Sequence, residues 1–352
     1  MASSFLIYGS YGFLGRAITR LAKQQGLQPI LAGRNKEKVK QQAGELGSDY
    51  RVFALDDARE IHSGLENVEL LLNCAGPYMH TYKPLVEACL HQGCHYLDLT
   101  GELNVFQGIA AFDEQAQEKD VMLLPGAGFD VVPTDCLAVH LQKRLPEATH
   151  LTLAFHFDGP ANLPPGSLNT MVEMFPEDWS QVHREDGELR VAPGKRKSRL
   201  VDFGRGPTKA VMLTWGDVFT AYYSTGIPNI ENYMVLGEDL VRQLRLTSIL
   251  RPLFRFEFVR RLARSTMPEG STAEERAVSY GRVWGEVMDN QGNKAVSRIT
   301  GPEATVEWTS LTTLGIVRKI FNGEYKPGYQ TPAMAYGADF VLENGPVVRE
   351  DL

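Results

Sequence analysis

The sequence predicts an α/β fold, in which a Rossmann-type doubly wound parallel sheet is followed by a second α+β domain with a mainly antiparallel sheet. Three observations lead to this prediction. The amino-terminal segment runs strand, glycine turn, helix and strand within about thirty residues. Short apolar runs then alternate with helical patterns as far as residue 124. Beyond residue 135 apolar and polar residues alternate singly, which is typical of strands with one buried face.

The amino-terminal segment carries the most specific motif. Phe5–Tyr8 is a run of four apolar residues, as expected of a strand buried on both faces. The loop GSYGFLG follows and opens into an amphipathic helix that ends at Gly26. Missing side chains let the backbone approach a pyrophosphate, and the N–H groups of the helix start point at its charge. The residues expected to bind the cofactor here are Gly9, Ser10, Tyr11, Gly12, Phe13, Leu14 and Gly15.

The second strand, near residues 29–32, indicates which dinucleotide binds. An NAD site usually has Asp or Glu at the end of this strand, where it binds the ribose 2′-OH. This chain has Gly33, Arg34, Asn35 and Lys36 instead. A guanidinium can pair with a 2′-phosphate, so we predict NADP, held by Arg34 and Asn35. The structural alternative is a solvated arginine at a helix start.

The rest of the first domain repeats the strand–helix pattern. The expected strands are residues 50–55, 68–73, 95–98 and 121–124, and the expected helices are residues 36–46, 105–118 and one that Thr81 caps. Each unusual loop follows the carboxyl end of a strand, and in an open parallel sheet those loops share one edge. We therefore expect Asp56, Ala75, Gly76 and Pro77 to bind the cofactor, and Thr100 and Phe129 to bind the substrate.

The second domain is predicted from alternating strands. They are residues 151–158, 210–213, 233–236, 277–288 and 294–300. The turn DNQGN joins the last two strands as a hairpin. A surface hairpin or loop is expected at 185–197, and a helix at 303–321. Ser167 and Thr170 follow PPG at a helix start and are expected to bind substrate, with simple capping as the alternative. The predicted domains are 1–136 for NADP, 137–324 for substrate or dimerisation, and a terminal segment 325–352 that returns to the first domain.

Six motifs give the chain a family resemblance. They are GSYGFLG (9–15), LAGRN (31–35), NCAGPY (73–78), YLDLTGE (96–102), PGAGFDVVPTD (125–135) and TPAMAYGADFV (331–341). With these the chain resembles the saccharopine dehydrogenase-like oxidoreductases, and more closely their trans-acting enoyl reductase branch. The resemblance implies an NADP-linked oxidoreductase with a Rossmann domain and an α+β substrate or dimerisation domain. It does not fix the substrate.

Three side chains are the candidates for catalysis. Tyr78 offers a phenol as proton donor, or an aromatic shelf for the nicotinamide ring. Asp98 and Glu102 lie at the same predicted edge, where two carboxylates can orient a substrate amine or relay a proton. The structural alternative is that Asp98 caps a neighbouring helix and Glu102 holds the loop. Cys89, His91, Cys94 and His95 cluster in sequence, but their expected placement on a helix face and a strand argues against a metal site.

Composition limits the class of protein. The chain has 352 residues, 43% of them hydrophobic and 22% charged, with a formal net charge of −7, so a soluble globular protein without nucleic-acid partners is expected. No apolar run is long enough to span a membrane, and the first strand leaves no room for a signal peptide. Four cysteines without a framework spacing favour a reducing compartment, taken as the cytoplasm.

The segment 241–264 differs from the rest in charge. It contains seven arginines and a single acid, Glu257, among many apolar residues. Such a segment suits an anionic membrane surface or an acyl-carrier partner. The alternative is a two-faced helix packed on its own domain or on the mate in a homodimer.

The predicted function is an NADPH-dependent reductase of an activated double bond. By resemblance the substrate is of enoyl type or a related unsaturated compound, and hydride transfer is expected in the cleft between the domains. Two alternatives stay open. One is a non-catalytic NADP-binding sensor or lipid-associated protein, and the other is an imine or amino-acid reductase of saccharopine dehydrogenase type.

Overall fold

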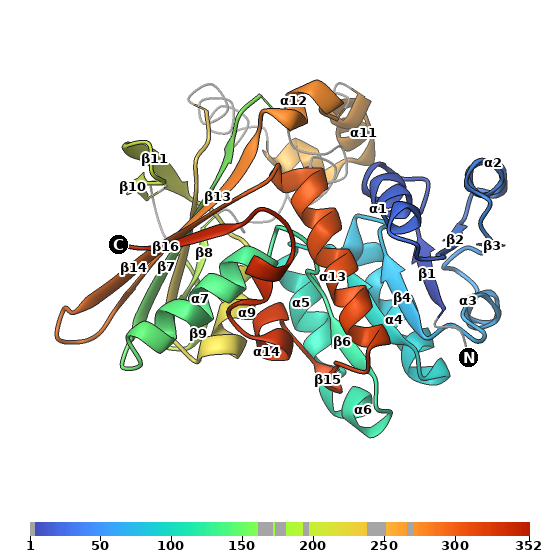
Figure 1. Ribbon diagram of the computed structural model, residues 1–352, viewed down its shortest axis with the longest axis horizontal. Helices are drawn as coiled ribbons and strands as arrows, with labels where there is room; N and C mark the ends of the chain where they lie inside the picture. Colours follow the sequence, from blue (N-terminus) through green and yellow to red (C-terminus); the bar gives the residue numbers. More distant parts are fainter. Residues whose placement is uncertain (1–3, 161–171, 173–180, 193–196, 238–250, 266–269) are drawn as a thin grey trace. The chain divides into compact units, whose positions relative to one another are not determined.

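The protein forms two compact units, each built from two stretches of the chain (Figure 1). The computed structural model describes residues 4–160, 172, 181–192, 197–237, 251–265 and 270–352. The first unit comprises residues 1–132 and 306–336, and the second comprises 133–305 and 337–352. The chain therefore passes from one unit to the other three times, whereas the predicted domains followed one another along the sequence.

The first unit is built on a seven-stranded parallel sheet, as predicted. Its strand order is β15-β6-β5-β4-β1-β2-β3, and every pair is parallel. The strands are β1 (Phe5–Tyr8), β2 (Ile30–Gly33), β3 (Tyr50–Val52), β4 (Leu70–Asn73), β5 (His95–Asp98), β6 (Met122–Leu124) and β15 (Gly328–Tyr329). Every residue of β1, β4 and β5 is buried, and accordingly β1 and the first three residues of β4 are continuous apolar runs in the sequence. The order reverses between β1 and β4, and ligands bind outside the carboxyl ends of the strands at such a point.

Helices connect these strands. They are α1 (Phe13–Gln24), α2 (Lys36–Leu46), α3 (Ala58–Gly64), α4 (Tyr82–Gln92), α5 (Leu103–Ala110), α6 (Asp113–Glu118), α13 (Thr309–Phe321) and α14 (Pro332–Tyr336), with a 3-10 turn η1 at Tyr78–His80. The sequence predicted one helix over 105–118, and the structure has two, because the chain bends at Ala111 and Phe112. The predicted side-chain cap of α4 by Thr81 was also wrong. Thr81 occupies the cap position, but its hydroxyl donates to the Ala75 carbonyl oxygen at 2.8 Å instead of accepting from the helix.

The second unit is built on a nine-stranded, mainly antiparallel sheet of order β10-β11-β12-β7-β13-β14-β16, with β8 and β9 beside it. The strands are β7 (His150–Asp158), β8 (Val182–Glu185), β9 (Glu188–Val191), β10 (Ser198–Asp202), β11 (Pro207–Met212), β12 (Asn229–Met234), β13 (Tyr280–Met288), β14 (Lys294–Gly301) and β16 (Val348–Asp351). Among the described strand pairs of this second sheet, only the pair of β12 with β7 is parallel. Trp284, Phe203 and Tyr233 lie in a core cluster on this sheet. The class of the second domain is therefore as predicted.

The helices of the second unit are α7 (Val132–Arg144), α9 (Asp217–Thr225), α11 (Glu257–Ser265) and α12 (Ala273–Ala277), with 3-10 turns η2 (Arg251–Arg255) and η4 (Phe340–Glu343). The predicted strand 277–288 begins only at Tyr280, because α12 precedes it. A capping box formed by Thr272 and Glu275 starts that helix, and its sequence signal was missed. Among the described residues, no helix has the length and apolar content needed to cross a bilayer.

The two ends of the terminal segment pair with different sheets. β15 adds to the parallel sheet beside β6, while β16 pairs with β14 of the second unit. The helix predicted over 303–321 begins as a π-helical turn, η3 (Ala304–Trp308), and continues as α13. The contact of the Phe321 ring with the Phe5 ring, at 5.9 Å between centroids, packs α13 against the start of β1.

Candidate functional site: a dinucleotide-binding edge

The glycine loop after β1 is built around very close backbone contacts. Gly9 has φ of +79°, which only glycine adopts without strain, and its N–H donates to the Ala32 carbonyl oxygen at 2.8 Å. A Cβ on Gly15 would lie 2.3 Å from the Gly9 carbonyl oxygen and 2.9 Å from the Ser10 Cα. The three predicted glycines therefore allow α1 to begin directly against the end of β1.

The start of α1 suits an anion. Its N-cap is Gly12, which has no side chain to cap the helix, and the first turn contains no acidic residue. The partial positive charge of the helix start is therefore unopposed by this helix's own side chains. Beside it the Ser10 hydroxyl is buried and has no hydrogen-bond partner among the described residues. These features fit the diphosphate of a dinucleotide, as predicted from the motif.

The loop after β2 presents positive charge. Arg34 is exposed and makes no hydrogen bond or ion pair within the described part of the chain. Lys38, which is not among the predicted site residues, places its Nζ 5.9 Å from the centre of the Tyr11 ring. The Asn35 side chain accepts the Lys38 N–H at 3.0 Å and caps α2, a contact that the prediction did not include. Asn35 therefore shapes the loop, while Arg34 and Lys38 offer positive charge to a phosphate.

Tyr8 and Asp56 lie at the same edge. The pKa of the Tyr8 phenol is raised to about 12, mainly by burial and also by Tyr11 and Asp56, while the Arg34 guanidinium acts in the opposite direction. Asp56 is exposed just beyond β3. The sheet thus brings Tyr11, Arg34 and Asp56 together, as their positions after neighbouring strands predicted.

The loop after β4 is held by two buried side chains. Asn73 accepts the Ala75 N–H at 3.0 Å and donates to the Tyr96 hydroxyl at 3.2 Å. Both Glu102 carboxylate oxygens accept backbone N–H groups, from Tyr78 at 2.8 Å and Met79 at 2.9 Å. The Gly76–Pro77 peptide bond between them is cis. Glu102 therefore makes the loop-holding contacts that were the structural alternative for it.

Asp98 connects the loops after β5 and β6. One carboxylate oxygen accepts the N–H groups of Thr100 and Gly126, each at 3.0 Å, and the other accepts the Tyr96 hydroxyl at 2.9 Å. Asp98 does not cap a helix, which corrects the structural alternative proposed for it. Burial raises its pKa to about 7, outweighing the three hydrogen bonds that favour the charged form. Thr100 is fully buried, and its hydroxyl accepts the Glu102 N–H at 3.0 Å.

Tyr78 lies among acidic groups. Burial raises the pKa of its phenol well above the usual value, and Cys74, Asp98, Glu102 and Asp130 raise it further. Burial also raises the pKa of Asp130 to about 7. The predicted site residues do not include Asp130, although its loop follows β6 at the same edge of the sheet. The position after a parallel strand was the available signal.

Phe129, predicted to bind substrate, is held by contacts within the first unit. Phe129 is buried, its ring lies 5.2 Å from the Trp308 ring, and its N–H donates to the Thr309 hydroxyl at 3.1 Å. These contacts fix Phe129 against the segment that leads into α13. Ser167 and Thr170 lie outside the described residues.

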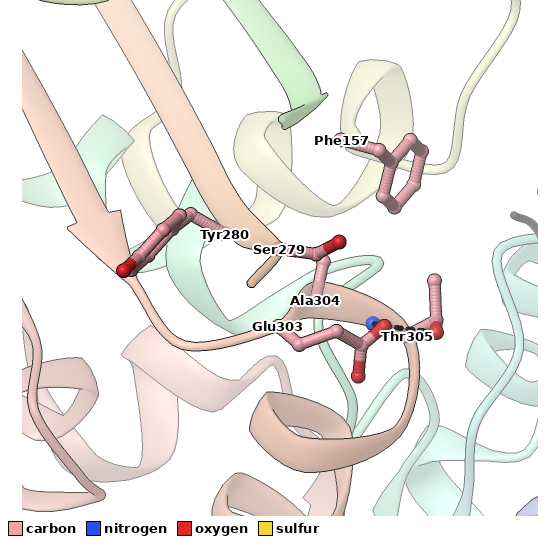
Figure 2. Close-up of a pocket in the computed structure, with 6 residues that line it drawn as sticks. All are labelled: Phe157, Ser279, Tyr280, Glu303, Ala304 and Thr305. Carbon is pink, nitrogen blue, oxygen red and sulfur yellow. Dashed lines mark hydrogen bonds between the residues drawn. The ribbon is translucent and has the colours of Figure 1, made fainter. Parts of the chain in front are cut away.

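A small pocket in the second unit is too small for a substrate. It is lined by Phe157, Ser279, Tyr280, Glu303, Ala304 and Thr305 and has room for about one water molecule. Figure 2 shows the Glu303 carboxylate turned toward Thr305, whose N–H it accepts at 2.7 Å. Among the described residues, no group of three or more His, Cys, Asp or Glu side chains is arranged to hold a metal ion.

The parallel sheet, its strand order and the glycine loop define a dinucleotide-binding Rossmann unit. Residues 5–124 match the saccharopine dehydrogenase NADP-binding domain. The cofactor is therefore NADP, as Arg34 predicted.

Curated relatives support the same family resemblance. The chain is 29% identical over 160 residues to the saccharopine dehydrogenase-like oxidoreductase of Mus musculus, covering 40% of this chain and 37% of that one. It is 28% identical over 183 residues to the trans-acting enoyl reductase of Mycobacterium ulcerans (strain Agy99), covering 50% and 41%. The matches thus span about two fifths of the length of these relatives. The predicted resemblance to saccharopine dehydrogenase-like oxidoreductases is confirmed.

A solved structure extends the likeness to the whole fold. The apo saccharopine dehydrogenase (L-Glu forming) of Saccharomyces cerevisiae aligns over 100% of both chains with a TM-score of 0.69 and 11% sequence identity. At this identity the match concerns the fold alone.

Replacing Gly15 with alanine tests the close contact of α1 with β1. Because the added Cβ would lie 2.3 Å from a backbone oxygen, the Gly15→Ala protein should bind NADPH more than about tenfold more weakly and lose about 1–3 kcal/mol of unfolding free energy. Titration calorimetry and urea unfolding measure the two effects. Gly44→Ala is the matched control, because nothing lies within 4 Å of its added Cβ. Equal behaviour of the two variants would contradict the assignment.

The buried Asp98 predicts a pH dependence of stability. Folding raises its pKa from an ordinary value near 4 to about 7, so across that interval the native state keeps a proton that the unfolded state releases. Its contribution to the unfolding free energy is therefore present at low pH and lost as pH rises toward 7. In urea unfolding at several pH values, the stability difference between wild type and Asp98→Asn should shrink as pH rises through this interval. The exposed Asp49→Asn is the control, and a difference that stays constant with pH would refute the assignment.

Proposed function

We propose that this chain is an NADPH-dependent oxidoreductase that reduces an activated double bond of enoyl type or a related unsaturated substrate. The observation that carries the proposal is that an NADP-binding glycine loop shares one sheet edge with Tyr78, Asp98 and Asp130. Groups that can hold or donate a proton therefore follow strands of the same parallel sheet as the cofactor loop. The name of the Mycobacterium ulcerans relative supports the enoyl class.

Different residues of the first unit bind different parts of NADPH. The glycine loop and the start of α1 bind the diphosphate, and Arg34 with Lys38 binds the 2′-phosphate. Ala75, Gly76 and Pro77 offer backbone groups to the rest of the nucleotide, in a loop whose position Glu102 fixes. When bound, NADPH supplies the hydride.

Tyr78 is the proposed proton donor. The phenol holds its proton at neutral pH, since burial raises its pKa further, and it gives up that proton only when hydride transfer places negative charge on the substrate beside it. Glu102 positions it by binding its backbone N–H. Asp98 orients the loops after β5 and β6, and Asp130, with a pKa of about 7, can return a proton near neutral pH.

Substrate contacts belong to the proposal as well. We assign Thr100 and Phe129 of the first unit to substrate binding. The proposal also includes substrate contact by Ser167 and Thr170, and substrate binding or dimerisation by the second unit, residues 133–305 and 337–352. Four free cysteines support a reducing compartment, and we place the protein in the cytoplasm.

Reduction of an imine formed on an amino acid is the second candidate. The name of the mouse relative and the likeness to saccharopine dehydrogenase support this candidate. This support is as strong as the support for the enoyl class. NADPH oxidation with a panel of enoyl, imine and ketone substrates separates the two. No turnover with any member, together with tight NADPH binding, would favour a non-catalytic sensor.

The variant Arg34→Ala tests cofactor choice. Loss of a charge-assisted hydrogen bond costs about 1.5–3 kcal/mol, so NADPH affinity should fall by about tenfold to over a hundredfold, while NADH affinity changes little. Fluorescence titration with both nucleotides measures this. Arg20→Ala, another exposed arginine of the same unit, is the control. An equal loss for both nucleotides would show that Arg34 does not bind the 2′-phosphate.

The variant Tyr78→Phe tests the proton donor. General acid catalysis contributes about a hundredfold or more, so kcat should fall by at least that factor while the affinity for NADPH is retained. Stopped-flow turnover and nucleotide titration give the two values. If Tyr78 is only an aromatic shelf, phenylalanine serves equally well and kcat stays within a few fold.

A further inference from the structure

The turn η2 and the helix α11 form a short basic segment in the second unit (Figure 1). Residues 251–265 contain five arginines and one acid, Glu257, whereas the whole chain has a net charge of −7. Glu257 is paired within the segment, to Arg260 at 2.6 Å and Arg264 at 3.3 Å. The hydrogen bond from Arg260 lowers the pKa of this carboxyl group and keeps it charged.

Large apolar side chains of this segment face outward. Phe258 is 70% exposed, Leu262 is 65% exposed and Phe256 is 55% exposed. A helix of a soluble protein normally turns such side chains toward the core. Here Phe258 and Leu262 are four residues apart and lie on one strip of α11. The Phe256 ring extends this strip, with its centre 5.9 Å from that of Phe258.

Positive charge flanks the apolar strip. Arg255 and Arg261 are exposed, and their side chains make no hydrogen bond or ion pair within the described residues. The surface therefore offers aromatic and aliphatic side chains together with guanidinium groups. Interfacial helices use this combination, because the apolar groups enter the headgroup boundary while the cations meet lipid phosphates.

We propose that residues 251–265 dock the protein on an anionic phospholipid membrane. Phe256, Phe258 and Leu262 enter the interface, and Arg255 and Arg261 pair with headgroup phosphates. Charge complementarity argues for this occupant, because the segment is strongly basic and its single acid is already neutralised. With three apolar anchors the contact is peripheral and reversible. The inference does not depend on the reductase function.

Sedimentation of the full chain with vesicles tests the proposal. The vesicles are phosphatidylcholine with roughly 30% phosphatidylserine, and phosphatidylcholine alone serves for comparison. The wild type should bind the anionic vesicles preferentially and be released by salt. The double variant F258S/L262S should bind more than about tenfold more weakly. The double variant R255Q/R261Q should lose about fivefold for each charge removed.

Controls separate docking from folding. Leu200→Ser changes a side chain that is 68% exposed on β10 and should bind vesicles like wild type. NADPH binding by all variants shows that they are folded, and turnover is not part of the readout.

Three outcomes would overturn the proposal. One is equal or absent binding to neutral and anionic vesicles. Another is a dimer that F258S/L262S abolishes, which would assign the strip to a second copy of the chain. The third is salt-sensitive binding of an acidic acyl-carrier protein without vesicle binding, which would assign it to a protein partner.

Discussion

The nucleotide-binding edge depends on one contact, the approach of α1 to the end of β1. The Gly15 Cα lies so close to the Gly9 carbonyl oxygen that any Cβ there would be 2.3 Å from it. This approach sets the direction of the first amide groups of α1, which no capping side chain occupies. Binding of an anion by backbone groups alone requires this geometry, since backbone donors cannot move toward a ligand as a long side chain can. The other loops of the edge then follow from the parallel order of the strands.

A second constraint acts through buried carboxylates. Asp98 and Glu102 together accept four backbone N–H groups, which fix the loops after β4, β5 and β6. The sequence could not show whether these acids hold loops or take part in catalysis, because an acid after a parallel strand is expected for either role. The contacts of Glu102 indicate loop holding, since both of its carboxylate oxygens accept backbone N–H groups. Asp98 retains a pKa of about 7 under the same kind of contact, since its burial is complete.

The first unit was predictable because its central strands are buried on both faces. β1 and most of β4 are runs of consecutive buried apolar residues, and such runs stand out in a sequence. The second unit was less predictable at its margins. β16 has mostly exposed side chains, so no apolar alternation marks it. No sequence pattern near α13 could show that this helix belongs to the first unit. Its place there depends on contacts between residues that are remote in sequence, such as Phe5 and Phe321.

In the candidate site, too, the sequence indicated some residues and missed others. Motif spacing indicated Gly9, Gly12, Gly15 and Arg34, because each requirement is local to one loop. Lys38 and Asp130 were missed, since their relevance arises only when Tyr11 and Tyr78 from other loops lie beside them. Asn35 has a further role that the motif did not indicate. Its place in the motif suggested a ligand contact, and its side chain also caps α2, because Asn accepts helix N–H groups well. Residues whose role depends on a single loop can thus be predicted from a motif, whereas those whose role depends on side chains from other loops need the three-dimensional neighbours.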